Sequence, residues 1–91
     1  MLTIYSKTVC PYCVNAKNYL KSKNIPFREI NIEEDQEARE FITTRGLRTV
    51  PQIFMDGKIF VEGGWSGLSK MSGEEILNEI ELRNSLTDQT L

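Results

Sequence analysis

Histidine is absent from the 91-residue sequence. Its absence removes the commonest general base and metal ligand, and with them every Cys–His or Ser–His catalytic pair. A surplus of positive charge is missing too, because 13 acidic residues outnumber 11 basic ones. Nucleic-acid binding needs the opposite balance on at least one face. Since no apolar run approaches the length that spans a bilayer, we expect neither a nucleic-acid partner nor a membrane partner.

The composition is that of one small globular domain. Hydrophobic residues make up 40% of the chain and charged residues 26%, which argues against disorder. A chain of this length buries roughly 64% of its unfolded surface. Residues 1–4 enter a strand-like pattern with no charged leader and no cleavage site, so we expect a cytoplasmic protein. We expect a monomer with its domain over residues 1–84 and a frayed polar tail at residues 85–91.

The first half of the chain predicts a strand–helix–strand unit. Apolar and polar residues alternate over Leu2–Ser6, which predicts a strand, and a second strand is expected over Phe27–Ile32. Between them, a helix begins at Pro11 and is stopped by the segment from Asn24 to Pro26. A crossover of this length implies a parallel strand pair with a right-handed connection.

The second half predicts a helix, a hairpin and a last helix. The helix spans Glu33–Arg45 with Gly46 as its cap, and its acidic start is expected to be solvated charge without a function. Asp56-Gly57 is a two-residue turn signal between strands Gln52–Met55 and Lys58–Val61. The last helix follows a capping box, and three apolar residues form its buried stripe. Those residues are Ser72 and Glu75 for the box and Ile76, Leu77 and Ile80 for the stripe. Together the elements predict an α/β fold, a mixed four-stranded sheet with about three flanking helices.

The only two cysteines, Cys10 and Cys13, have the C-x-x-C spacing typical of redox chemistry. Pro11 suits the first helical position, where its missing N–H has no intrahelical partner, and this makes Cys10 the N-cap. Unpaired amides and the helix dipole favour an anion there, and such placement lowers a thiol pKa from about 8.5 to roughly 3.5–7.5. Lys7 adds positive charge nearby. We therefore expect Cys10 to attack a disulfide and Cys13 to resolve the mixed disulfide.

Two other uses of the cysteine pair are weaker interpretations. A structural disulfide across so short a loop removes little chain entropy. A zinc site normally needs four Cys or His ligands, and the chain offers two. The sequence therefore predicts a redox pair and no metal site.

Three further features each leave two interpretations open. Pro51 fits either a cis Val50–Pro51 peptide bond, which would expose the Val50 backbone to an extended thiol peptide, or an ordinary strand start. Gly63-Gly64 fits either a close backbone approach that leaves helix-start amides free for a carboxylate, or a simple corner. Tyr12 and Trp65 are either walls of a surface groove or residues that cover the core.

Three segments carry a resemblance to a known family. Tyr5 to Cys13 reads Y-S-K-T-V-C-P-Y-C and resembles the active-site segment of dithiol glutaredoxins. Arg48 to Phe54 reads R-T-V-P-Q-I-F and resembles their cis-proline segment, and Gly63-Gly64 matches their double glycine. The resemblance spans about residues 1–83. It implies a thioredoxin-like fold, reduction of protein disulfides and glutathione mixed disulfides, and glutathione as the reductant, with no permanently bound cofactor.

By position, the resemblance also implies a glutathione groove. Val50 would pair its backbone with the cysteinyl part of glutathione, and Gly64 with the residues after it would hold the γ-glutamyl end. The implied lining residues are Lys7, Tyr12, Thr49, Val50, Pro51, Gly64, Trp65 and Ser66.

The sequence departs from the family after the double glycine. Glutaredoxins typically have an acidic residue there to meet the γ-glutamyl ammonium, whereas this chain has Trp65-Ser66-Gly67-Leu68. Trp65-Ser66-Gly67 is similar instead to small redoxins that pass electrons from thioredoxin reductase to ribonucleotide reductase, as is Gly46-Leu47-Arg48. Such a redoxin is the alternative expectation. An iron–sulfur cluster carrier is a lesser alternative, because Pro11 resembles a residue that disfavours cluster assembly in the family.

Overall fold

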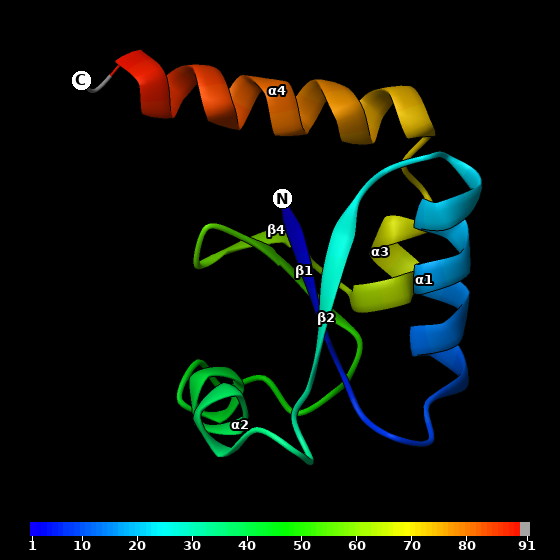
Figure 1. Ribbon diagram of the computed structural model, residues 1–91, viewed down its shortest axis with the longest axis vertical. Helices are drawn as coiled ribbons and strands as arrows, with labels where there is room; N and C mark the ends of the chain where they lie inside the picture. Colours follow the sequence, from blue (N-terminus) through cyan, green and yellow to red (C-terminus); the bar gives the residue numbers. More distant parts are fainter. Residues whose placement is uncertain (90–91) are drawn as a thin grey trace.

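The computed structural model describes residues 1–89, with side chains through residue 86, as one sheet and four helices (Figure 1). Among residues 1–89, no helix is long and apolar enough to cross a membrane. In chain order the elements are β1 (Leu2–Ser6), α1 (Pro11–Ser22), β2 (Phe27–Asn31), α2 (Gln36–Thr43), β3 (Gln52–Met55), β4 (Lys58–Val61), α3 (Gly64–Leu68) and α4 (Gly73–Gln89).

The sheet is mixed, as the sequence predicts. Its strand order is β2-β1-β3-β4, with β1 parallel to β2 and antiparallel to β3, and β3 antiparallel to β4. The hairpin turns at Asp56 and Gly57, whose φ angles of 52° and 79° are the positive values that a two-residue turn requires. All five residues of the central strand β1 are buried. Its carboxyl end therefore leads out of a packed core directly into the cysteine segment.

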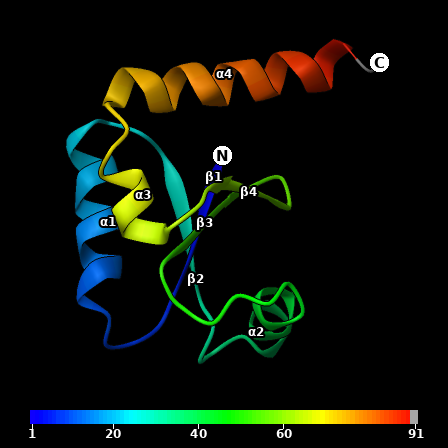
Figure 2. The same ribbon diagram turned by 180° about the vertical axis from the view of Figure 1, so that it is seen from behind.

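Helices cover the two faces of the sheet unequally (Figures 1 and 2). One face carries α1, α3 and the start of α4, over a core cluster that includes Leu2, Ile4 and Ile53. The other face carries α2 alone, where the Tyr5 ring packs against Phe41 and Phe54 with centroids 5.5 Å apart in each pair. The short helix α3, which the sequence pattern did not predict, brings the helix count to four.

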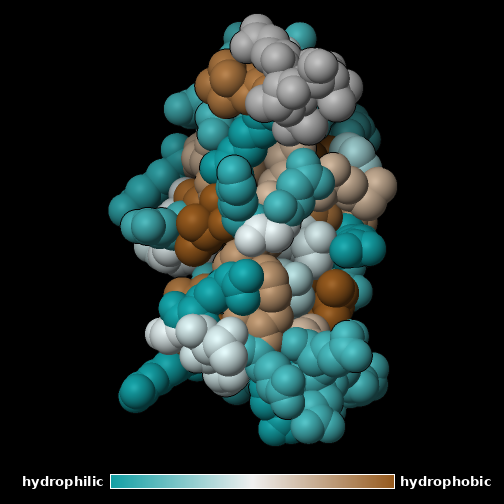
Figure 3. Space-filling view, turned by 90° about the vertical axis from the view of Figure 1, so that its left-hand side faces the viewer, coloured by the Kyte–Doolittle hydropathy of each residue, from teal (hydrophilic) through white to brown (hydrophobic). Residues whose placement is uncertain are grey.

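Helix α2 begins three residues later than predicted. The expected helix over Glu33–Arg45 is observed as Gln36–Thr43. Asp35 is its N-cap, and the Ala38 N–H donates to Asp35 Oδ1 at 3.0 Å. Asp is a preferred N-cap residue and Glu is not, so Asp35 was the better choice among the three consecutive acidic residues. The outward face of α2 is polar, and Figure 3 shows hydrophilic side chains gathered at this end of the molecule.

The residues before Asp35 form a turn instead of a first helical turn. The Glu33 N–H donates to Asn31 Oδ1 at 2.8 Å, and the Glu34 N–H donates to the Asn31 carbonyl at 3.1 Å. Strand β2 accordingly ends at Asn31, one residue earlier than predicted.

Helix α4 begins with the expected capping box. The Glu75 N–H donates to Ser72 Oγ at 3.1 Å, and the Ser72 N–H donates to Glu75 Oε1 at 3.0 Å. Ile76 is fully buried and Ile80 packs against the same core. Leu77 was predicted for the buried stripe and is 47% exposed, because it lies about 100° around the helix from Ile76. The helix includes residues 85–89 of the segment expected to fray, and residues 90 and 91 lie outside the described part of the chain.

A charged contact ties α1 to the sheet near the cysteines. Glu29 on β2 accepts hydrogen bonds from Ser6 Oγ at 2.7 Å and from Lys17 Nζ at 3.0 Å. The Ser6 hydroxyl first and the Lys17 ammonium after it hold the pKa of Glu29 below its usual value. Ser6 ends β1, and Lys17 follows Cys13 by about one helical turn. The contact therefore links the two segments on either side of Cys10.

We expect this contact to make folding stability sensitive to acid. Because the folded state keeps Glu29 charged, the unfolded chain binds the proton first, and the free energy of unfolding should fall as the pH drops below the ordinary glutamate value of 4.5. Urea unfolding at a series of pH values checks this. Glu29→Gln should flatten the decline, whereas Glu34→Gln, at a site with no side-chain hydrogen bond among the described residues, should keep it. Equal slopes for the parent and Glu29→Gln would contradict the prediction.

Candidate active site

The two cysteines lie where β1 passes into α1. Cys10 is the N-cap of α1 with extended backbone (φ −151°, ψ 93°), and Pro11 occupies the first turn, which confirms the predicted cap. The Cys13 N–H donates to Cys10 Sγ at 3.2 Å. The two residues form a disulfide with a Cα–Cα distance of 5.2 Å. Cys10 is 8% exposed and Cys13 only 2%, so the first sulfur is the more accessible one.

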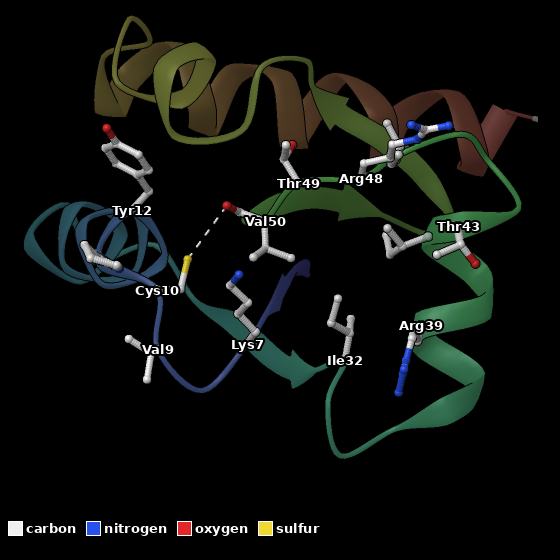
Figure 4. Close-up of a pocket in the computed structure, with 13 residues that line it drawn as sticks. Lys7, Val9, Cys10, Tyr12, Ile32, Arg39, Thr43, Arg48, Thr49 and Val50 are labelled. Atoms are coloured by element: carbon white, nitrogen blue, oxygen red, sulfur yellow. Dashed lines mark hydrogen bonds between the residues drawn. The ribbon is translucent and has the colours of Figure 1, made fainter.

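The Val50–Pro51 peptide bond is cis, which settles the choice left open by the sequence. The Val50 carbonyl oxygen lies 3.7 Å from Cys10 Sγ (Figure 4). Gln52 stabilises this segment, because its Nε2 donates to the Thr49 carbonyl at 2.9 Å and to Thr49 Oγ1 at 3.2 Å. A backbone segment capable of pairing with an extended peptide therefore stands directly beside the sulfur.

The double glycine makes the close backbone approach that was one of its two interpretations. Gly63 and Gly64 have φ angles of 86° and 57°, in the left-handed region that favours glycine. A Cβ on Gly64 would lie 2.5 Å from the Pro51 carbonyl oxygen. The start of α3 is thus pressed against the cis-proline segment in a way that no other residue type permits.

Two cavities flank the backbone of Val50. The smaller, of about 350 Å³, is lined by Tyr12, Thr49, Val50, Pro51, Gly63, Gly64, Trp65 and Ser66. The larger, of about 470 Å³, is lined by Lys7, Val9, Cys10, Pro11, Tyr12, Ile32, Arg39, Ile42, Thr43, Leu47, Arg48, Thr49 and Val50 (Figure 4). Every predicted site residue except Cys13 lines one cavity or both. Cys13 lies behind Cys10, inside the protein.

The two aromatic residues differ in which of the roles left open by the sequence they take. Tyr12 is 63% exposed and forms a wall between the two cavities. Trp65 lines the smaller cavity, and its ring also packs edge-on against Tyr19 at 5.5 Å, beside the main core cluster. Trp65 is therefore a groove wall whose position is fixed by the core.

The structure adds site residues that sequence reasoning missed. Arg39 from α2 and Arg48 from the loop before β3 join Lys7 around the larger cavity, and no Asp or Glu of the described residues lines it. Val9, which precedes Cys10, is 79% exposed. Arg48 directly precedes the Thr49-Val50-Pro51 segment, so the sequence could have predicted it as a site residue. Arg39 could not be predicted in this way, because only the packing of α2 on the sheet brings it to the cavity.

The order of strands and helices, together with a cysteine pair at a helix start facing a cis-proline, defines a thioredoxin-like fold. The glutaredoxin family model matches residues 2–61. Glutaredoxin 3 of Escherichia coli (strain K12) is 46% identical over 56 residues, which are 60% of this chain and 68% of that protein. The solution structure of a glutaredoxin from Brucella melitensis superposes with a TM-score of 0.67 and 34% identity, covering 87% of this chain and 85% of that one.

A fourth comparison concerns a related type of protein. The NrdH-redoxin from Escherichia coli, described as glutaredoxin-like with a thioredoxin-like activity profile, superposes with a TM-score of 0.61. It is 25% identical, and the match covers 85% of this chain and 91% of that one. The present chain belongs to the glutaredoxin family, whose members are thiol–disulfide oxidoreductases that use glutathione as a reductant rather than as a bound cofactor.

The packing of Gly64 leads to a prediction with a matched control. Gly64→Ala should lower the free energy of unfolding by about 1–2 kcal/mol because of its positive φ, and by about 1–3 kcal/mol more because the new Cβ displaces Pro51. It should also raise the KM for a disulfide substrate. Gly57→Ala has a φ of +79° with nothing within 4 Å of its Cβ, so it should lose only the first amount and keep the parent KM. Urea unfolding and steady-state kinetics measure both. The prediction is wrong if the two variants behave alike.

Proposed function

We propose that this chain reduces protein disulfides and glutathione mixed disulfides through Cys10 and Cys13, with glutathione as the reductant. The observation that carries the proposal is the hydrogen bond from the Cys13 N–H to Cys10 Sγ, 3.2 Å long, at the edge of the larger cavity. That amide and the helix start stabilise a thiolate. Cys10 is therefore the sulfur that reacts first. Cys13 is 2% exposed and is within reach of the Cys10 sulfur but shielded from external disulfides.

The proposed reaction is two successive thiol–disulfide exchanges. The Cys10 thiolate attacks one sulfur of the substrate disulfide, the substrate S–S bond breaks, and the leaving thiolate takes up a proton. Cys13 then loses its proton and attacks Cys10 Sγ, which releases the second substrate sulfur as a thiol and forms the Cys10–Cys13 disulfide. The substrate has gained two electrons and two protons. Two glutathione molecules return them to the pair and leave as glutathione disulfide.

The two cavities support a peptide lying across Val50. Antiparallel pairing with the backbone of Val50 would direct the carboxyl end of the peptide toward Arg48 and its amino end toward Gly64. Lys7, Arg39 and Arg48 surround the first of these ends, so a glycyl carboxylate of glutathione would meet cations there.

A second candidate is a redoxin reduced by thioredoxin reductase. It is favoured by one observation at the smaller cavity, where the amino end of the peptide would lie. Among the residues that the structure describes, no acidic one lines the smaller cavity, where Trp65 and Ser66 follow the double glycine. A γ-glutamyl ammonium would find a hydroxyl there but no carboxylate. The likeness to NrdH-redoxin supports the same candidate, for which ribonucleotide reductase is the proposed partner. Both donors belong to reducing compartments, and we propose the cytoplasm for either.

The division of roles between the cysteines predicts two different variants. Cys13→Ser should keep the removal of glutathione from a mixed disulfide, which needs one thiol, and should lose reduction of a protein disulfide by about 100-fold or more. Cys10→Ser should lose both activities. Assays with a glutathionylated peptide and a disulfide-bonded protein measure them separately. Substantial activity of Cys10→Ser on either substrate would reverse the assignment.

The electron donor is decided by a two-reductant comparison on the unmodified protein. If glutathione is the donor, NADPH should be consumed in the presence of glutathione and glutathione reductase, and about tenfold more slowly with thioredoxin reductase, the difference expected for one well-placed charged contact. The opposite ratio would assign the chain to the redoxin type, with the same cysteine chemistry.

A further inference from the structure

The segment between β1 and α1 has no apolar anchor. Ser6, at the end of β1, is fully buried and Cys10 is 8% exposed. The three residues between them, Lys7, Thr8 and Val9, are all exposed. Hydrophobic packing therefore does not fix the segment that delivers the chain to the reactive sulfur, and its conformation depends on polar contacts.

Two side chains from the turn after β2 supply those contacts. The Thr8 N–H donates to Glu33 Oε1 at 2.7 Å, and Asn31 Nδ2 donates to Thr8 Oγ1 at 3.2 Å. Asn31 Oδ1 also accepts from the Glu33 N–H at 2.8 Å, so the two side chains brace each other. Thr8, Asn31 and Glu33 form what we call the Thr8 clamp, which grips the backbone two residues before Cys10.

Glu33 is held in its charged form. The hydrogen bonds from Thr8 contribute most to lowering the pKa of Glu33, and the charges of Lys7 on the same loop and of Arg39 on α2 lower it further. The acidic neighbours Glu34 and Glu40 share the shallow cavity beside it. A charged acceptor makes a shorter and stronger hydrogen bond than a neutral one. The hydrogen bond from the Thr8 N–H to the Glu33 carboxylate is therefore formed at neutral pH.

We propose that Glu33 is a positioning residue for Cys10, holding Thr8 so that the sulfur stays over the first-turn amide of α1. The inference rests on the proposed function, because it assumes that Cys10 is the nucleophile. On its helix side Cys10 is fixed by the Val14 N–H, which donates to its carbonyl at 3.1 Å. The Thr8 clamp supplies the constraint on the loop side. Without it, the 3.2 Å hydrogen bond from the Cys13 N–H to Cys10 Sγ is free to lengthen.

The test is alkylation of Cys10 by iodoacetamide across a pH series in the Cys13→Ser background, where Cys10 is the sole thiol. Glu33→Ala should slow alkylation at neutral pH about three- to tenfold and shift its midpoint upward, because a less well-placed amide stabilises the thiolate less. Glu33→Gln keeps an oxygen that accepts from the Thr8 N–H and should restore most of the rate. The control Glu34→Ala removes the same charge one residue away, where no side-chain hydrogen bond is described, and should match the parent.

The possible outcomes distinguish failure of the inference about Glu33 from failure of the proposed function of Cys10. A parent midpoint equal to that of free cysteine overturns both. A lowered parent midpoint that Glu33→Ala leaves unchanged overturns the inference alone. If Glu33→Gln is as slow as Glu33→Ala, charge rather than position is responsible, and the inference is wrong.

A second measurement does not depend on the thiol. The NMR shift of the Thr8 amide proton should titrate with Glu33 in the parent and stay constant in Glu33→Gln. An amide shift that does not titrate in the folded parent would also overturn the inference.

Discussion

The site depends on one short contact, the donation of the Cys13 N–H to the sulfur of Cys10. The first amides of a helix have no partner within it, and the one at Cys13 is directed at a sulfur because Cys10 is the N-cap. The surrounding structure keeps that sulfur in place. The buried strand β1 fixes the start of the segment, and Pro11 fixes the first turn of α1. The Val50 carbonyl oxygen lies 3.7 Å from the same sulfur, on the side from which the proposed substrate would approach.

Sequence reasoning succeeded where the physical cause lies within a few residues. Pro11 after Cys10, Asp56 before Gly57, and Ser72 three residues before Glu75 each specify a local geometry, and each is observed. The mixed character of the sheet followed as well, because crossover length implies a parallel pair and the two-residue turn implies an antiparallel hairpin. The pairing of β1 with β3, which sets the strand order, is seen only in the structure.

The errors arose from one local signal that was passed over and from tertiary contacts. Asp is a preferred N-cap residue and Glu is not, so Asp35 was the better start for α2, and Asn31 holds Glu33 and Glu34 in the preceding turn. Glu33 then reaches Thr8, 25 residues away in the chain, a partner that no local pattern indicates. The stripe of α4 was misjudged at Leu77 for a similar reason, since only the position of the sheet shows which side of the helix is buried.

Electrostatic differences along the groove narrow the question of the electron donor. The proposed sulfur chemistry and the proposed backbone pairing at Val50 would be the same for any thiol peptide, so they do not discriminate between donors. The end with Lys7, Arg39 and Arg48 would accept a carboxylate from glutathione or from an acidic protein segment alike. Discrimination is therefore left to the end with Trp65 and Ser66, where a zwitterionic γ-glutamyl group needs a countercharge and a neutral protein segment does not.

The segment that leads to Cys10 is held by polar contacts, and such contacts leave the entrance to the larger cavity uncovered. If Val9 were instead held by apolar packing, the packing side chains would have to cover Val9. They would then also cover the neighbouring Cys10 sulfur and the entrance to the larger cavity. The hydrogen bonds of the Thr8 clamp act on the backbone amide and the hydroxyl of Thr8, and they come from the turn that follows β2. They constrain the segment and leave Val9 79% exposed. For Cys10 as the proposed nucleophile, contacts of this kind would give orientation without placing further side chains over the entrance to the larger cavity.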